Sequence, residues 1–302
     1  MLRLNNIIPS SSNYPFMDYK KYFILISSFA IIISLIFLIF KGLNLGIDFK
    51  GGTLIEISTK NSNISELRSI LSPEFNDVSL QEFGNSETIL IRLQNSSSKE
   101  SIETIDKVKK LISNKVVEFR RSEFVGPTIS SELLWTGLQA IGFSLIAILI
   151  YIWLRFEWQF GIGAVVALTH DVIFTLGFLS LFGIDFSLSS IAAILTIAGY
   201  SINDSVVIFD RIRENLRKYK KLDLIDLFNL SINNTLSRTV MTSLTTLIAL
   251  ICLFIFGGEV IKPFAIAMII GVLIGTYSSI FIAVPTLLIF KFRPQEDDNK
   301  LI

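Results

Sequence analysis

Six long apolar segments constrain the fold of this 302-residue chain more than any other feature of its sequence. The first is an unbroken apolar run over residues 22–40, and about 20 such residues cross a bilayer as a helix. The other five segments cover residues 133–154, 160–182, 187–209, 238–256 and 263–290. Hydrophobic residues make up 51% of the chain, as is typical of integral membrane proteins. The sequence therefore predicts an α-helical polytopic membrane protein with six transmembrane helices.

The first apolar run differs from a secretory signal. A signal sequence has an apolar core of about 7–15 residues followed by a small-residue cleavage site. Here the run is longer and continues directly into Lys41 and Gly42. We therefore interpret residues 22–40 as an uncleaved membrane anchor that follows a polar N-terminal segment, residues 1–21.

A hydrophilic domain is predicted between the first two transmembrane segments, over residues 41–132. Alternating apolar residues indicate strands, and apolar residues three or four positions apart indicate helices. The predicted strands cover 53–57, 78–83, 88–93 and 116–125, the predicted helices cover 63–71 and 98–115, and a turn is expected at Gly84-Asn85. The order β-α-β-β-α-β predicts one external ferredoxin-like α+β domain.

The distribution of lysine and arginine predicts the orientation in the membrane. Short cytoplasmic loops are rich in these residues, whereas long domains do not count in this rule. An inside N-terminus places Lys20, Lys21 and Arg155 on the inner side, together with the basic loop 210–237 and the tail 291–302, while the short outer turns hold only Lys262. Both termini are therefore expected in the cytoplasm and the ferredoxin-like domain in the periplasm.

Several function classes are disfavoured by composition and motifs. The net charge of +1 does not indicate a nucleic-acid-binding protein. Cys252 is the only cysteine, so no disulfide can form within the chain. The sequence contains no glycine-rich phosphate loop and no metal-ligand spacing. We therefore expect a protein that is not an enzyme and carries no metal or cofactor.

Polar residues interrupt three of the apolar segments. His170-Asp171 lies in the middle of the third, Asn203-Asp204 in the inner part of the fourth, and Arg238 at the start of the fifth. An aspartate at the centre of a membrane helix costs at least about 2.5–3.5 kcal/mol. Such residues are therefore functional candidates by default.

Each of these residues lies on a helix face with small or hydroxyl-bearing neighbours. Such faces allow helices to approach closely and to satisfy a buried charge. The three faces are Ala164, Ala167, Asp171 and Thr175; Ala193, Thr196, Tyr200, Asp204 and Val207; and Arg238, Thr242, Thr245, Ala249 and Cys252. We expect the three faces to meet inside the bundle. A fourth face, Ala267, Gly271, Gly275 and Ser279, fits internal packing and a partner subunit equally well.

Structural roles are open for most of these residues. Arg238 could extend its side chain to the inner membrane surface. His170 could be a hydrogen-bonded interior histidine, and Asp171 could be an acceptor for a neighbouring helix. Asp204 fits a structural role less well, because it lies a helical turn or more from the charged cluster at 210–214, which is expected to be a solvated helix end.

The attraction between Asp204 and Arg238, if they form a pair, would depend on whether Asp204 is protonated. Burial disfavours the charged carboxylate and a nearby guanidinium favours it. Protonation of Asp204 would weaken its attraction to Arg238 and release the guanidinium, which is the behaviour of a two-state switch.

Five blocks of sequence resemble the SecD/SecF family of protein-export subunits, and within it the SecF type. The blocks are 46–52 (GIDFKGG), 125–127 (VGP), 151–158 (YIWLRFEW) with His170-Asp171, 192–215, and 237–239 with Thr242-Ser243. The resemblance extends in one register from about residue 15 to residue 293. One departure is Asp185, where the family pattern has a glutamate, and the charge is kept.

The resemblance implies half of a transporter of the resistance–nodulation–division superfamily, with SecD as the other half. Such a subunit would use the proton-motive force to promote preprotein translocation and release on the outer side of the bacterial inner membrane. The implied partners are SecD, the SecYEG channel, YajC or YidC, and the unfolded preprotein. The family's intramembrane Asp and Arg fall on Asp204 and Arg238. A role for His170-Asp171 is less defined.

Two other functions remain open on the sequence. The first is a small-molecule efflux half-transporter of the same superfamily, although one external domain of under a hundred residues is small for enclosing a substrate path. The second is a membrane scaffold in which the buried charges only hold helices together.

Overall fold

The computed structural model describes residues 13–59, 64–75, 78–83, 85–94, 98–258 and 260–290. These residues form two compact units, which are described separately. The helical unit contains residues 13–43, 141–184 and 192–290, and the mixed unit contains residues 44–140 and 185–191.

Six helical segments are long and apolar enough to cross a membrane, among the described residues. Five are single helices: α1 (Lys20–Phe40), α5 (Pro127–Arg155), α6 (Trp158–Phe182), α7 (Leu188–Lys218) and α8 (Leu224–Phe256). The sixth consists of α9 (Lys262–Ser278), a π-helical turn η3 (Ser279–Ala283) and α10 (Val284–Ile289). The expected six-helix membrane protein is confirmed.

The wide turn η3 has a local cause in the sequence. Pro285 is the second residue of α10, and proline has no N–H to donate to the carbonyl four residues earlier. A π-turn changes the hydrogen-bond register at such a position without ending the helix.

The mixed unit has the predicted ferredoxin-like plan. Its elements are β2 (Gly52–Ser58), α3 (Ile64–Leu71), β3 (Val78–Phe83), β4 (Asn85–Leu93), α4 (Ser98–Ile112) and β5 (Glu118–Val125). The sheet order is β3-β4-β2-β5 and every pairing is antiparallel. Strand β4 begins three residues before the predicted 88–93, and Gly84 of the predicted turn lies outside the described residues.

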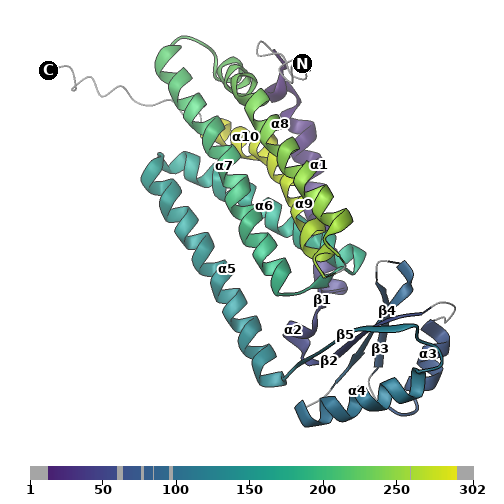
Figure 1. The fold of residues 1–302 in the computed structure, drawn as a ribbon. Coiled ribbons are helices and arrows are strands. Elements are labelled where there is room, and N and C mark those ends of the chain that lie inside the picture. Colours follow the sequence, from purple (N-terminus) through teal and green to yellow (C-terminus); the bar gives the residue numbers. More distant parts are fainter. Residues whose placement is uncertain are drawn as a thin grey trace. The chain divides into compact units, whose positions relative to one another are not determined.

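Helices α3 and α4 lie against one face of this sheet (Figure 1). The residues between them and the sheet are apolar at strand and helix spacing, as expected for a half-buried strand and an amphipathic helix. They include Ile55, Ile57, Ile89 and Ile91 from the strands, and Leu67, Leu71, Val108 and Ile112 from the helices. The amphipathic patterns therefore specify how this unit packs.

Gly51 and Gly52 allow the chain to enter β2. Their φ angles are +74° and +103°, which residues with a Cβ rarely adopt. A Cβ on Gly52 would also collide with the carbonyl oxygen of Leu93. The pair is therefore required by backbone geometry.

Two short strands in the mixed unit are absent from the sequence prediction. Strand β1 (Asn44–Leu45) pairs in parallel with β6 (Asp185–Phe186), 141 residues later. A turn was expected over residues 183–186; Gly183 has left-handed turn geometry, and Asp185–Phe186 is a strand. Two-residue strands have no detectable periodicity, so the sequence pattern could not show this pairing.

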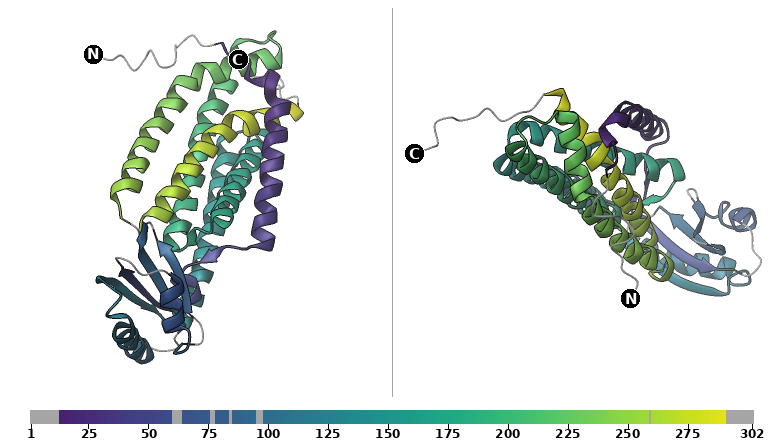
Figure 2. Two further views of the ribbon diagram at one scale, coloured as in Figure 1. Left: turned by 90° about the vertical axis from the view of Figure 1, so that its right-hand side faces the viewer. Right: turned by 90° about the horizontal axis from the view of Figure 1, so that it is seen from above.

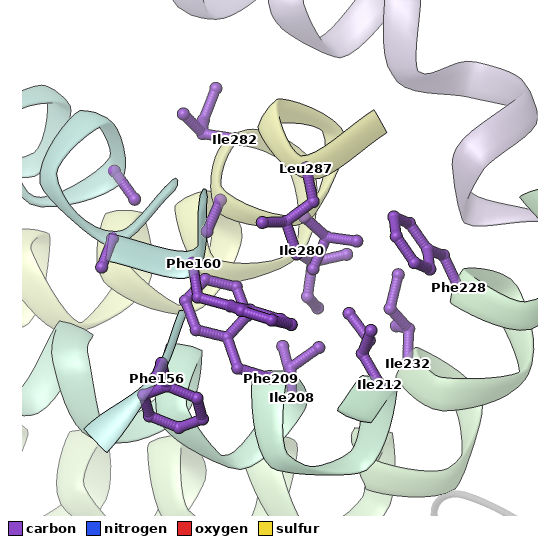
Figure 3. Close-up of a cluster of buried hydrophobic side chains, with 14 of the residues drawn as sticks. Phe156, Phe160, Ile208, Phe209, Ile212, Phe228, Ile232, Ile280, Ile282 and Leu287 are labelled. Carbon is purple, nitrogen blue, oxygen red and sulfur yellow. The ribbon is translucent and has the colours of Figure 1, made fainter. Parts of the chain in front are cut away.

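The prediction of a loop over residues 210–237 is wrong. Helix α7 continues to Lys218, and α8 begins at Leu224 with Asp223 capping its N-terminus. Apolar side chains continue on the inner face of both extensions and join the bundle core: Phe209, Ile212 and Leu216 from α7, and Phe228, Ile232 and Leu236 from α8. Figure 3 shows several of these side chains around Ile280 and Leu287. The ring centroids of Phe160 and Phe209 lie 5.1 Å apart. The charges mark the end of the apolar span and not the end of the helix.

Helices α1 and α6 run side by side in close contact (Figure 2). A Cβ on Gly177 of α6 would lie 2.6 Å from the Cα of Ser34 in α1. At the end of this contact the Ser180 hydroxyl donates to the carbonyl of Phe37 at 3.1 Å. Small residues at a membrane helix interface permit this approach.

Candidate functional site

Asp204 lies deep in the helical unit. It is 16 residues after the first residue of α7 and 14 before the last, and its side chain is 2% exposed. Thr276 of α9 lies near the carboxyl group, and the charge of Arg238 on α8 acts on it. Its Oδ2 has no hydrogen-bond partner among the described residues. This carboxyl group therefore has an acceptor atom free inside the bundle.

A chain of hydroxyl groups leads away from this carboxyl group. Thr276 Oγ1 lies 2.6 Å from Ser243 Oγ of α8, and the Tyr200 hydroxyl donates to Ser243 Oγ at 3.3 Å. Hydroxyl groups both donate and accept. Three helices thus contribute to one polar path that begins at Asp204. Thr276 is absent from the residues predicted from the sequence, although its i+4 spacing from the buried Val272 places it near the interior face of α9.

Asp171 forms a separate and fully occupied hydrogen-bond network. Its Oδ2 accepts from Ser201 Oγ of α7 at 2.5 Å and from Ser278 Oγ of α9 at 2.7 Å. Its Oδ1 lies 3.0 Å from His170 Nδ1. The Asp171 side chain is 0% exposed and that of His170 6%. This geometry favours the reading of Asp171 as an acceptor that ties α6 to two other helices.

His170 is satisfied on one side of its ring only. Its Nδ1 contacts Asp171, whereas its Nε2 is buried without a partner among the described residues. The sequence left open that His170 is a fully hydrogen-bonded interior histidine, and the structure agrees with this for Nδ1 but not for Nε2.

Arg238 does not lie at a helix end. It follows the first residue of α8 by 14 positions, or about 21 Å of helix, and it still lies where the apolar part of that helix begins. The guanidinium acts on Asp204 through its charge without a direct ion pair within 4 Å, among the described residues. Asp204 and Arg238 therefore interact by charge at a distance and do not form a direct ion pair.

The expectation that all three polar faces meet inside the bundle is wrong for α8. Arg238, Thr245, Ala249 and Cys252 are exposed on the surface of this chain. The buried positions of this part of α8 are instead Thr239, Ser243 and Leu250. Asn203, next to Asp204, is exposed as well. Small and polar residues identify a helix-packing face, but their spacing does not tell whether the neighbour belongs to the same chain.

The charged cluster at 210–214 is a surface network, as expected, but α7 continues beyond it to Lys218. Arg155 donates to Asp210 at 2.9 and 3.1 Å, and both side chains are 43% exposed. Arg211 pairs with Glu214 at 2.6 Å. Exposed ion pairs of this kind contribute little stability.

In the mixed unit, Asp185 of β6 forms an ion pair with Arg92 of β4. Burial raises the pKa of the Asp185 carboxyl group, and the Arg92 guanidinium opposes this shift. Asn44 also donates to Asp185, at 2.6 Å. The carboxylate that replaces the expected glutamate thus fixes β6 to the sheet.

No group of three or more histidine, cysteine or acidic residues is placed to hold a metal ion, within the part of the chain that the structure describes. The buried side chains around Asp171 and Asp204 carry carboxylate, hydroxyl and imidazole groups from α6, α7, α8 and α9. Such groups can hold, donate and accept protons.

Two protein families match the chain. Residues 104–293 match the family described as "Protein export membrane protein SecD/SecF, C-terminal", and residues 36–62 match the "SecD/SecF GG Motif". The second match contains Gly51 and Gly52, whose backbone requires glycine.

Relatives and solved structures agree with these matches. The chain is 45% identical over 295 residues to the protein translocase subunit SecF of Rickettsia felis, covering 95% of both chains. It is 47% identical over 294 residues to that of Rickettsia typhi, covering 95% of this chain and 94% of the relative. The crystal structure of SecDF, a translocon-associated membrane protein from Thermus thermophilus, matches with a TM-score of 0.86 and 35% identity over 96% of this chain.

A structure of SecDF in a super-membrane-facing form matches with a TM-score of 0.67, also at 35% identity, over 93% of this chain. The chain spans 41% and 39% of the lengths of these two solved chains. By the family matches and by its identity to full-length relatives, this chain belongs to the SecD/SecF family of protein export membrane proteins.

Proposed function

We propose that this chain is a SecF-type subunit that uses the proton-motive force to promote preprotein translocation and release. Asp204 is the group that takes up and releases the proton, and Arg238 is its counter-charge. Asn203 is the chain neighbour of Asp204, whereas His170 and Asp171 act structurally by tying α6 to α7 and α9. The proposal requires no cofactor, because the proton gradient supplies the energy.

The observation that carries the proposal is the surroundings of Asp204. A buried carboxyl group with a free oxygen and an adjacent hydroxyl path is suited to exchanging a proton. Its attraction to Arg238 depends on its charge, so protonation changes the force between α7 and α8. Moving one charge across 100 mV supplies about 2.3 kcal/mol, and this shifts a two-state equilibrium by more than a factor of ten.

The exposed polar face of α8 supports SecD as the partner. Arg238, Thr245 and Ala249 face away from the chain's own core, and polar side chains are costly against lipid. A second helical half would cover them. The solved relatives carry more than twice the length of this chain, which is the size expected for two such halves. Contacts with SecYEG, YajC or YidC and the unfolded preprotein follow from this role.

The same proposal gives the orientation. Both termini lie in the cytoplasm of a bacterial cell with the mixed unit in the periplasm, because the lysine and arginine residues of the short connections gather on one side. The helical extensions to Lys218 and from Leu224 then form the inner surface.

Replacement of Asp204 by Asn tests the mechanism. Asn keeps the size and the hydrogen-bonding capacity and cannot gain or lose a proton. Release of a slowly exported preprotein from membrane vesicles should lose its dependence on the proton gradient, a fall of at least about tenfold from the energy above. The matched control is Asp226→Asn, because Asp226 is exposed in the first turn of α8. Unchanged gradient-dependent release in Asp204→Asn would contradict proton coupling and favour the scaffold.

A further inference from the structure

An apolar groove lies on the helical unit between α1, α6 and the η3–α10 segment. Its volume is about 710 Å³, within the roughly 300–1,000 Å³ of specific ligand sites. The walls are almost entirely apolar, with Ile24 and Ile32 from α1, Val166 and Ile173 from α6, and Ile282 and Leu288 from the last segment. Two cationic side chains, Lys20 and Lys21, line the groove where α1 begins.

The groove is elongated along α1. It reaches from Lys20 to Ile32, about 18 Å at 1.5 Å per residue. One extended acyl chain suits a groove of this length and apolar lining.

The positive charge of Lys20 and Lys21, where α1 begins, indicates a ligand with an anionic head group. Within the described part of the chain, neither Lys20 nor Lys21 takes part in an ion pair or a hydrogen bond of its ammonium group. Asp18, in the 3-10 turn η2 (Phe16–Tyr19), is exposed and likewise unpaired there. Two lysines at the end of an apolar groove between membrane helices match a phosphate followed by an acyl chain.

We propose that this groove is a binding site for an anionic phospholipid, with the phosphate at Lys20 and Lys21 and one acyl chain between α1 and α6. His170 lines the same groove, so the bound chain covers the outer side of the His170–Asp171 pair. This inference concerns lipid binding only and holds whether or not the chain couples protons to export.

Lipid retention by the purified, delipidated full chain tests the proposal. Native mass spectrometry would compare phosphatidylglycerol with phosphatidylcholine of the same acyl chains. Each lysine near an anionic lipid is worth a factor of about five, so the preference for phosphatidylglycerol should be about 25-fold and should vanish in Lys20→Gln/Lys21→Gln. Ser28→Phe, which fills the groove, should weaken the binding of both lipids.

The matched control is Lys220→Gln/Lys221→Gln. It removes the same charge from the same end of the bundle, since Met17 before α1 donates to Asn229 near the start of α8. Lys220 and Lys221 lie in the turn before α8 and do not line the groove. The control should keep the lipid preference within about twofold of the wild type.

Three results would overturn the proposal. The first is an unchanged lipid preference in the Lys20 and Lys21 variant. The second is competition by inorganic phosphate as strong as that by phosphatidylglycerol, because a phosphate site alone would not need the groove. The third is a photo-crosslinker at position 28 that yields a protein adduct in native membranes, where a phospholipid adduct is expected.

Discussion

The two buried aspartates of the helical unit differ in their hydrogen bonds. Asp171 has contacts on both carboxylate oxygens, from His170, Ser201 and Ser278. Asp204 keeps one oxygen without a partner among the described residues. A carboxylate with all its acceptors occupied holds helices together, and one with a free acceptor can bind a proton at lower cost. The hydrogen bonds therefore suit Asp171 to a structural role and leave Asp204 as the carboxyl group for the proposed proton exchange.

Ser201→Ala should destabilise the bundle. It removes one of two hydroxyl donors to Asp171 Oδ2, and hydrogen bonds between membrane helices contribute about 0.6 kcal/mol on average and at most about 1.7. Unfolding in mixed micelles should show a loss of this size. Ser28→Ala is the control, because the exposed Ser28 hydroxyl bonds only its own helix, at Ile24. Equal losses in the two variants would argue against the Asp171 network.

The Asp185 carboxyl group should make stability depend on pH in an unusual direction. Its pKa is raised by burial against the opposing charge of Arg92, so the folded state binds more protons than the unfolded state just above the ordinary value of about 3.9. Stability from this group is present at lower pH and is lost as pH rises through that interval toward the raised pKa.

The measurement is thermal unfolding of the full chain between pH 4 and 7. The wild type should lose stability with rising pH relative to Asp185→Asn, which cannot titrate there. Asp106→Asn, at an exposed position of α4, should give a curve parallel to the wild type. A wild-type curve that also runs parallel to Asp185→Asn would refute the raised pKa.

For single residues, the sequence predicts which charged side chains are functional candidates but not which side chains form hydrogen bonds with them. The cost of charge in an apolar segment points to Asp171, Asp204 and Arg238 without a structure. Ser201, Ser278 and Thr276 escape notice, because serine and threonine are common in membrane helices and only their three-dimensional position shows what they bind.

Among the elements, the contact between α1 and α6 depends on one glycine. Gly177→Ala should destabilise the bundle by about 1–3 kcal/mol, the usual cost of overpacking, because the added Cβ meets the backbone of Ser34. The control is Gly142→Ala in α5, where nothing lies within 4 Å and alanine favours the helix. Unfolding in micelles compares the two. A neutral Gly177→Ala would show that α1 and α6 are not closely packed.

Helix positions are predicted well and helix ends are not. The length of the apolar runs locates all six spans, since each must face lipid or core over its length. The extensions to Lys218 and from Leu224 were missed because charge was read as the end of the helix. An amphipathic continuation, in which Ile212 and Leu216 keep the inner face, is the signal that could have revealed them.

For the whole molecule, the exposed polar face of α8 is the surface that the proposed SecD partner would cover. Ala249→Trp should abolish copurification of the SecD partner, because a large ring cannot fit where a small residue lets helices approach. The control is Ala147→Trp on the exposed, apolar surface of α5, which should copurify the partner normally. If both variants copurify the partner equally, the partner binds elsewhere.

The parallel pairing of β1 with β6 limits how this protein can be divided for experiments. A recombinant fragment of residues 41–132 contains the complete four-stranded sheet and both of its helices. It nevertheless lacks Asp185 and Phe186, so Arg92 loses its carboxylate and the ring of Phe49 loses the ring that lies 5.7 Å away. The strand β1 then becomes an open edge, and open edges recruit other chains. Such a fragment would associate or lose order at this end unless residues 185–191 were joined to it as a tethered peptide.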